Sequence, residues 1–329
     1  MSTKTIFMFS GQGSQYYSMG RDLYDNHGTF RYWMNYCAGI AEGHLGVNLI
    51  NHIFEERADK YEPFTRTLYT SPAIFMVNYS VAQTLMDEGI QPDILLGYSL
   101  GEIVALAVSG FVSLEDALDF LIRSSRLVET KTPPASMLAV LHSPEIVEDY
   151  PAQFHNTTVA SLNFSKSFVI AGVVERLKEL QRFLAEKHIL TQLLPIDCGF
   201  HSPLIEGVEE EYKLMLETMR PEESRIPVIS SVYSQRLDRN SITQEYYWNL
   251  IRQPVNFEKT VQMLENEGSY LYIDAGPSGT LATFVKYLVK PGSLSSALPL
   301  LDQFGYNMRN LNKVRSACDL IHHAQRKYA

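Results

Sequence analysis

Short apolar runs alternate with longer amphipathic segments along this chain, and the alternation predicts an α/β protein. The runs have the composition of buried strands and lie at residues 5–9, 94–96, 228–232 and 270–274. Between them, apolar residues recur at helical spacing. In the stretch 69–89, for example, Ser71 and Pro72 predict an N-cap followed by a first-turn proline. Buried strands separated by helices are typical of a parallel sheet with helices on both faces.

The middle of the chain has a different rhythm, which predicts a separate small subdomain. Its segments follow the order strand, helix, strand, strand, helix, strand over residues 137–141, 144–154, 158–162, 168–172, 174–187 and 191–196. This is the order of a ferredoxin-like unit. We therefore expect a ferredoxin-like small subdomain at residues 134–196. It would be inserted into an α/β-hydrolase-like large subdomain made of residues 1–133 and 197–329.

Composition narrows the classes of partner and environment. The chain has 329 residues, of which 45% are hydrophobic and 20% charged, so it can form a large core. A formal net charge of −9 argues against nucleic acid as the main partner. No apolar run reaches the length of a membrane span. The three cysteines are far apart and form no CxxC pair, which predicts free thiols, a cytoplasmic location and no metal site.

The stretch 94–108 carries the strongest chemical signal. The apolar residues 94–96 are followed by the pentapeptide Gly-Tyr-Ser-Leu-Gly and then by an apolar, Ala-rich segment. This is the strand, sharp turn and helix of a nucleophile elbow, in which the serine of Gly-x-Ser-x-Gly lies at the apex. Ser99 is therefore the candidate nucleophile, and the main-chain N–H of Leu100 is a candidate oxyanion donor.

Two further segments are candidates to complete such a site. His201 lies where the chain returns from the small subdomain, and it is the best choice of general base among nine histidines. The loop after the first strand, Gly11-Gln12-Gly13, lacks the third glycine of a dinucleotide fingerprint and the Gly-Lys-Ser/Thr of a phosphate loop. Its main chain can still approach another group closely, which makes Gln12 the candidate for a second oxyanion donor.

The chain resembles the malonyl-CoA:acyl-carrier-protein transacylase family, which includes the acyltransferases of polyketide and fatty-acid synthases. The resemblance covers essentially the whole chain and is carried by Gly-Gln-Gly-Ser-Gln at 11–15, Gly-Tyr-Ser-Leu-Gly-Glu at 97–102, Phe-His-Ser at 200–202 and Gly-Pro at 276–277. It implies that a Ser99–His201 dyad carries the acyl group as a serine ester. It also implies an oxyanion hole formed by the N–H groups of Gln12 and Leu100.

The resemblance implies further features of the site. A main-chain carbonyl of Asn249-Leu250 is expected to orient His201, and Asn163 and Phe200 are expected near the substrate pocket. The acyl group would be carried on CoA or on the phosphopantetheine of an acyl carrier protein domain of a polyketide synthase, with no other cofactor. A monomer is expected.

Two positions depart from the family pattern. The residue before the nucleophile is usually His but here is Tyr98, a candidate pocket residue whose side chain either fills or gates the substrate pocket or merely packs against its neighbours. On the helix after the elbow, Ser124 occupies the position where members that use malonyl carry an Arg that pairs with the substrate carboxylate. Arg123 and Arg126 are close in sequence, but one helical step is a rotation of about 100°, so neither points the same way. A carboxylate buried without a partner costs about 1–3 kcal/mol, so malonyl is expected to be a poor substrate.

These departures favour the stand-alone acyl hydrolases of trans-acyltransferase polyketide systems, which this chain also resembles in its opening loop and in Gly-Tyr-Ser. The expected function is proofreading, in which acyl groups are hydrolysed from acyl carrier protein. The alternative is a trans-acting CoA:acyl carrier protein acyltransferase that loads malonyl or another acyl unit. A non-catalytic scaffold is disfavoured because Ser99, His201 and both loops are present. An unrelated esterase is disfavoured because the early loop lacks a His-Gly motif.

Overall fold

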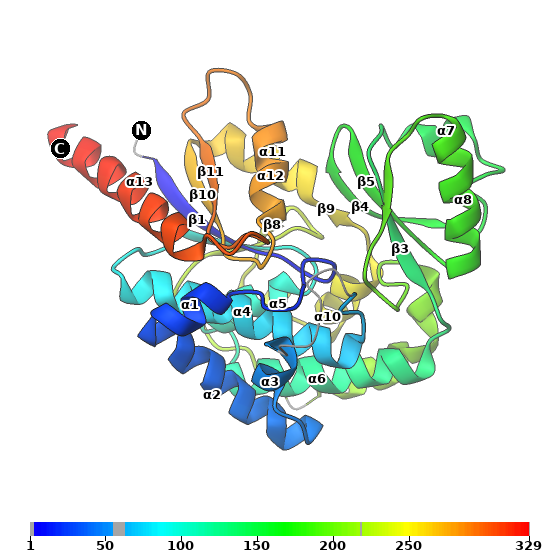
Figure 1. Cartoon of the computed structure of the whole chain (residues 1–329), viewed down its shortest axis with the longest axis horizontal. Coiled ribbons are helices and arrows are strands. Elements are labelled where there is room, and N and C mark those ends of the chain that lie inside the picture. Colours follow the sequence, from blue (N-terminus) through cyan, green and yellow to red (C-terminus); the bar gives the residue numbers. More distant parts are fainter. Residues whose placement is uncertain (1–2, 55–62, 218, 329) are drawn as a thin grey trace.

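The computed structural model describes residues 3–54, 63–217 and 219–328, which form two sheets with their helices (Figure 1). The larger sheet has the order β11-β10-β1-β2-β7-β8. Its neighbouring strands are parallel except for β7 and β8. The strands are β1 (Lys4–Phe9), β2 (Ile94–Gly97), β7 (Val228–Ser230), β8 (Gln235–Arg236), β10 (Tyr270–Asp274) and β11 (Ser296–Pro299).

Helices cover both faces of the larger sheet, as expected for an α/β protein. Along β1, Phe7 and Phe9 belong to one core cluster, whereas Ile6 and Met8 belong to another that includes α11 and α12. This alternation follows from the two-residue period of a strand. The helices of this subdomain are α1 (Arg21–Asn26), α2 (Gly28–Leu45), α3 (Leu49–Ile53), α4 (Thr67–Asp87), α5 (Gly101–Ser109), α6 (Leu114–Lys131), α9 (Glu209–Leu214), α10 (Gln244–Arg252), α11 (Phe257–Glu267), α12 (Thr280–Leu288) and α13 (Asn307–Tyr328), with 3-10 turns η1 (Pro203–Val208) and η2 (Arg239–Ser241).

The second sheet contains the ferredoxin-like unit. Its order is β6-β3-β5-β4-β9, and the first four strands are antiparallel neighbours. Two of its segments are shorter than expected, because Pro151 comes two residues after the end of α7 and Pro195 cannot donate to a ladder beyond β6. The elements are β3 (Ser136–Val140), α7 (Ile146–Asp149), β4 (Thr158–Phe164), β5 (Ser167–Gly172), α8 (Val174–Glu186) and β6 (Thr191–Leu193).

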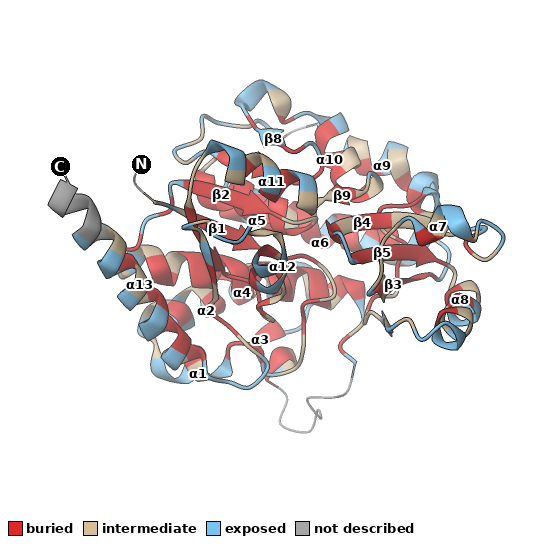
Figure 2. Ribbon diagram, turned by 90° about the horizontal axis from the view of Figure 1, so that it is seen from above, coloured by how far each residue is buried: buried red, intermediate tan, exposed pale blue. Residues whose placement is uncertain are grey.

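The fifth strand of this sheet comes from the other part of the chain and was not predicted. The short strand β9 (Val255–Asn256) pairs in parallel with Ser161 and Leu162 of β4. The N–H of Asn256 also donates to the carbonyl of Ser231, just beyond β7 of the larger sheet (2.8 Å). A single stretch of main chain thus joins the two sheets. Figure 2 shows both sheets buried within the molecule, with the exposed residues on the outer helices and loops.

The beginning of α4 differs from the expectation. The helix starts at Thr67, so Ser71 is not its N-cap and Pro72 lies within the helix. A side chain from another helix takes over the capping role, since the N–H of Leu68 donates to a carboxylate oxygen of Glu129 (2.8 Å). Within the described ranges, none of the helices is both long and apolar enough to cross a membrane.

Candidate active site

Ser99 lies at the apex of the turn between β2 and α5, as the elbow motif predicts. Its φ is +53°, in the left-handed region that residues with side chains seldom adopt. The turn depends on a close approach between strand and helix, because a Cβ at Gly101 would overlap the carbonyl oxygen of Phe9. The hydroxyl therefore lies at the N-terminus of α5, where main-chain N–H groups favour negative charge.

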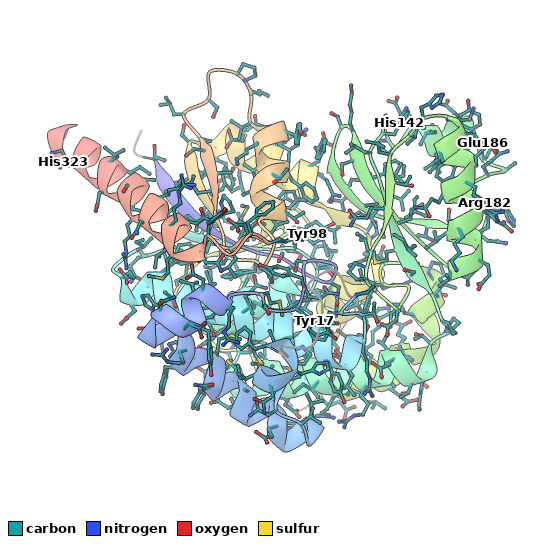
Figure 3. The ribbon with its side chains drawn as sticks, in the orientation of Figure 1. Tyr17, Tyr98, His142, Arg182, Glu186 and His323 are labelled. Carbon is teal, nitrogen blue, oxygen red and sulfur yellow. The ribbon has the colours of Figure 1, made fainter. Side chains whose placement is uncertain are left out.

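The structure brings His201 to Ser99 although 102 positions separate them. Ser99 Oγ lies 2.8 Å from His201 Nε2. His201 also has a left-handed backbone, with φ +59°, and its N–H donates to the carbonyl of Ile251 (2.7 Å). His201 as a whole is only 3% exposed. Two other histidines, His142 and His323, are labelled in Figure 3 and lie near opposite ends of the molecule.

A main-chain carbonyl orients the imidazole, but it is not the one expected. His201 Nδ1 lies 2.7 Å from the carbonyl oxygen of Gln253. The expected segment Asn249-Leu250 lies inside α10, and the carbonyl of Asn249 already accepts from the N–H of Gln253 (2.8 Å). Gln253 is the first residue beyond this helix, so its carbonyl is free of the helical ladder. The assignment to Asn249-Leu250 is therefore wrong.

The hydrogen bonds settle which ring nitrogen of His201 carries the proton. A carbonyl only accepts, so Nδ1 donates to Gln253 and Nε2 accepts from Ser99. Burial lowers the pKa of His201 to about 4, and the hydrogen bond to Gln253 opposes this shift. The imidazole is thus neutral at pH 7 and can accept a proton from serine.

The loop after β1 lies against the elbow. A Cβ at Gly11 would be 2.8 Å from the carbonyl oxygen of Tyr98 and 3.2 Å from the nitrogen of Leu100, so the main chains almost touch. The hydroxyl of Ser14 holds the loop by donating to the carbonyl of Gly11 (2.7 Å). Among the described residues, no protein acceptor takes a hydrogen bond from the N–H of Gln12 or of Leu100. Both donors remain available to a ligand oxygen.

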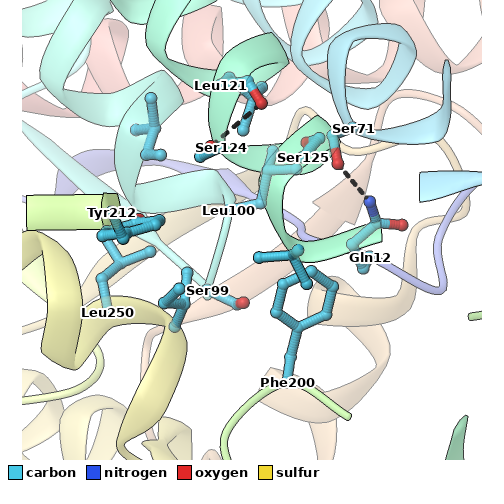
Figure 4. A pocket seen from close by; sticks show the side chains of 13 residues that line it. Gln12, Ser71, Ser99, Leu100, Leu121, Ser124, Ser125, Phe200, Tyr212 and Leu250 are labelled. Atoms are coloured by element: carbon cyan, nitrogen blue, oxygen red, sulfur yellow. Dashed lines mark hydrogen bonds between the residues drawn. The ribbon is translucent and has the colours of Figure 1, made fainter. Parts of the chain in front are cut away.

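A pocket that is partly open to solvent extends from Ser99 (Figure 4). Two of the expected pocket residues, Ser124 and Phe200, line it. The side chain of Gln12 forms part of its wall and is held by donation to Ser71 Oγ (2.6 Å). The full lining is Gln12, Ser71, Ser99, Leu100, Ile103, Leu121, Ser124, Ser125, Val128, Phe200, Tyr212, Leu250 and Ile251.

Tyr98 and Asn163 do not line this pocket, although both were expected there. The Tyr98 hydroxyl donates to Asn163 Oδ1 (2.9 Å), and its ring packs edge-on against Phe257 with centroids 5.7 Å apart. Burial raises the pKa of Tyr98, so the phenol stays neutral. The pair therefore ties the elbow to β4 of the small subdomain.

Known proteins with similar sequences agree with this geometry. The family model described as "Acyl transferase domain" matches residues 6–325. The chain belongs to the acyl transferase family. It is 37% identical over 314 residues to the polyketide biosynthesis acyltransferase homolog PksD of Bacillus subtilis, covering 95% of this chain and 96% of that protein. It is also 37% identical over 317 residues to BaeD of Bacillus velezensis, a homolog of the same description, covering 96% and 97%.

Solved structures of acyl transferases share the fold. The loading acyltransferase of the avermectin modular polyketide synthase superposes with a TM-score of 0.87 at 26% identity, covering 96% of this chain and 99% of that one. The MCAT of Streptococcus pneumoniae gives a TM-score of 0.77 at 27% identity, covering 94% and 100%. Both results show that this chain has the fold of known acyl transferases.

As an acyl transferase, this chain has an uncharged pocket. The described residues that line it include no Lys, Arg or His. The two arginines near Ser124 are engaged elsewhere: Arg123 pairs with Asp119 (3.2 Å), and Arg126 donates to the carbonyl of His44 (2.8 Å). Over the described part of the chain, no three His, Cys, Asp or Glu residues are placed to hold a metal ion.

One functional feature was missed by sequence reasoning. Glu102 is fully buried in the first turn of α5, and its carboxylate accepts from the N–H groups of Ser231 (2.9 Å) and Val232 (3.1 Å) and from the Tyr246 hydroxyl (2.7 Å). Burial raises the pKa of Glu102, and these hydrogen bonds oppose the shift. The sequence signal was a single carboxylate within the otherwise apolar helix α5. Its effect is to hold the elbow helix against the end of β7.

Proposed function

We propose that this acyl transferase moves acyl groups between thioesters through an ester on Ser99. The observation that carries the proposal is the chain of contacts from the Gln253 carbonyl through neutral His201 to the Ser99 hydroxyl, at 2.7 and 2.8 Å. A serine is a weak nucleophile unless a base takes its proton, and this arrangement supplies the base. Such a base typically contributes about 10²–10⁴-fold in rate.

The first half-reaction forms the serine ester. His201 Nε2 takes the proton from Ser99 as Oγ attacks the thioester carbonyl, and Nδ1–H stays bonded to Gln253. The oxyanion that develops lies between the N–H groups of Gln12 and Leu100, each worth about 10²–10³-fold in rate. When the intermediate collapses, the C–S bond breaks and the imidazolium returns its proton to the leaving thiolate. The second half-reaction repeats these steps in reverse with an acceptor thiol.

The substrates we propose are acyl thioesters of polyketide biosynthesis. PksD and BaeD, which the chain matches over nearly its whole length, are described as polyketide biosynthesis acyltransferase homologs. We therefore propose CoA or the phosphopantetheine arm of an acyl carrier protein as donor and acceptor. None of the described residues that line the pocket carries a positive charge, so the acyl group should be uncharged rather than malonyl. The monomeric state and cytoplasmic location stay predictions.

Hydrolysis is the second candidate. The absence of a cationic partner among the described pocket residues removes the main feature needed to load malonyl, and it favours removal of uncharged acyl groups. In that reaction water replaces the acceptor thiol in the second half-reaction. The family and its polyketide relatives support transfer better than hydrolysis, so transfer is the primary proposal.

The fate of the acyl group tests the proposal. After incubation with butyryl-CoA, intact-protein mass spectrometry is expected to show one butyryl group on the enzyme. On addition of a holo acyl carrier protein, the label is expected to appear as butyryl-carrier, with free butyrate as a minor product. Butyrate as the main product, at the same rate with and without carrier, would establish hydrolysis and overturn transfer.

Ser124→Arg is expected to shift selectivity toward malonyl. A guanidinium in the pocket would pair with the substrate carboxylate and offset its desolvation, so the ratio of malonyl to butyryl labelling should rise about tenfold or more. The ratio is measured by intact mass with equimolar malonyl-CoA and butyryl-CoA. Ser124→Gln is the matched control, since it adds length without charge and should not raise the ratio. An unchanged ratio in Ser124→Arg contradicts the clamp argument.

A further inference from the structure

One wall of the pocket is lined by hydroxyl groups. Helix α6 presents Leu121, Ser124, Ser125 and Val128 to the pocket, at the i, i+3, i+4 and i+7 positions of one helical face. Helix α4 adds Ser71. Figure 4 shows the three serines together, across the pocket from Ser99 and Phe200 in this view. An apolar acyl chain alone does not require this wall, because hydroxyls lose water when hydrocarbon covers them.

The three hydroxyls differ in what they bond. Ser124 Oγ donates to the carbonyl of Leu121 (3.1 Å). Ser71 Oγ accepts a hydrogen bond from Gln12 Nε2 (2.6 Å), which leaves its own hydroxyl hydrogen free to be donated. Ser125 is only 4% exposed, yet its hydroxyl forms no hydrogen bond with any protein group in the described part of the chain. A helical serine ordinarily bonds back to the carbonyl four residues earlier, and Ser125 does not.

The Ser125 oxygen is also reachable from the pocket. Three other side chains have polar atoms that are both unbonded and completely enclosed: Ser80, Ser161 and Tyr247. The Ser125 hydroxyl is also unbonded, but it is not completely enclosed. Because Ser125 lines the pocket, its oxygen is accessible from there. An open donor and acceptor therefore faces the space that the acyl chain fills. A buried hydroxyl without a hydrogen-bond partner typically weakens the binding of the ligand that covers it by a factor of about ten.

We propose that Ser125, supported by Ser71 and Ser124, binds an uncharged oxygen substituent on the acyl chain. The preferred substrates would then be hydroxyacyl thioesters rather than plain hydrocarbon or carboxylated ones. Ser125 acts here as a specificity-determining residue and takes no part in proton transfer. The inference rests on the proposed function, because it assumes that the acyl group attached to Ser99 occupies this pocket.

A competition experiment tests the inference. The enzyme is offered equimolar butyryl and hydroxybutyryl thioesters of N-acetylcysteamine, with the hydroxyl at C2, C3 or C4 in separate reactions. Intact mass reports the ratio of the two acyl-enzymes within each reaction. At one hydroxyl position the ratio is expected to favour hydroxybutyryl about tenfold, and Ser125→Ala is expected to lower this ratio about tenfold. Because the ratio is internal, a loss of folded enzyme does not change it.

Thr130→Ala is the matched control. Thr130 is on the same helix outside the pocket lining, and its hydroxyl donates to the carbonyl of Arg126 (2.7 Å), so its removal should leave the ratio as in the wild type. Equal labelling by butyryl and all three hydroxybutyryl esters would overturn the inference and leave the acyl-enzyme intact. A preference that survives Ser125→Ala would also overturn it. No labelling by any ester would overturn the proposed function, and the inference with it.

Discussion

Ser99→Ala is expected to abolish acyl-enzyme formation. The substitution removes the only side-chain oxygen within hydrogen-bond reach of His201 Nε2 among the described residues, while the loop of Gln12 and the orienting carbonyl of Gln253 remain. Loss of a serine nucleophile typically costs about 10⁴-fold or more in rate. Intact mass after incubation with butyryl-CoA should therefore show only unmodified protein at times when the wild type is fully labelled.

A second serine variant separates chemistry from general damage. Ser165 lies in the exposed turn between β4 and β5, and Ser165→Ala should label as the wild type does. Circular dichroism should show that Ser99→Ala is folded, since alanine removes one oxygen from a half-buried site. If Ser99→Ala still gains a butyryl group, another residue is the nucleophile and the proposed mechanism is wrong.

Gly11→Ala is expected to slow acylation about 10²–10³-fold, the usual value of one oxyanion donor. The new Cβ would lie 2.8 Å from the Tyr98 carbonyl oxygen and 3.1 Å from Ser99 Cβ. Both obstacles belong to the elbow and cannot rotate away, so the loop must move. That movement withdraws the N–H of Gln12 from the position facing Leu100. The rate of butyryl labelling under single-turnover conditions measures the effect.

Gly39→Ala provides the comparison for this variant. Gly39 is exposed within α2, and a Cβ there would meet nothing within 4 Å. Alanine should raise the unfolding free energy by about 0.5–1 kcal/mol and leave acylation unchanged. Acylation by Gly11→Ala at the wild-type rate, in folded protein, would show that the loop does not supply an oxyanion donor.

Local pattern was sufficient for much of the fold. The elbow around Ser99 and the cap of α6 at Ser113 depend on residues within a few positions of each other, so their sequence carries the signal. The order of the ferredoxin-like unit was predictable for the same reason. The error at the start of α4 has a different origin. The helix starts at Thr67, upstream of Pro72, where Glu129 caps it from about 60 positions away in the sequence.

The parts that could not be predicted depend on contacts distant in sequence. The two residues of β9 are too few to show a strand pattern. They form a strand only because they pair with β4, about 95 positions earlier in the sequence. The carbonyl that orients His201 could be identified only once the end of α10 was known. The position of the Tyr98 side chain could not be predicted either, because its hydroxyl bonds to Asn163 of the other subdomain, 65 positions later in the sequence.

Residues 253–256 orient His201 and also pair with the small subdomain, which matters when subdomains are exchanged between members of this family. Residues 134–196 are contiguous and invite transplantation, but β9 pairs with β4 through main-chain atoms and continues directly from the carbonyl that holds His201. Main-chain pairing is indifferent to side-chain identity. A chimera should therefore tolerate many substitutions in β4, provided that its length and register are kept. A one-residue shift there would misalign the base more than any single side-chain change in the transplanted unit.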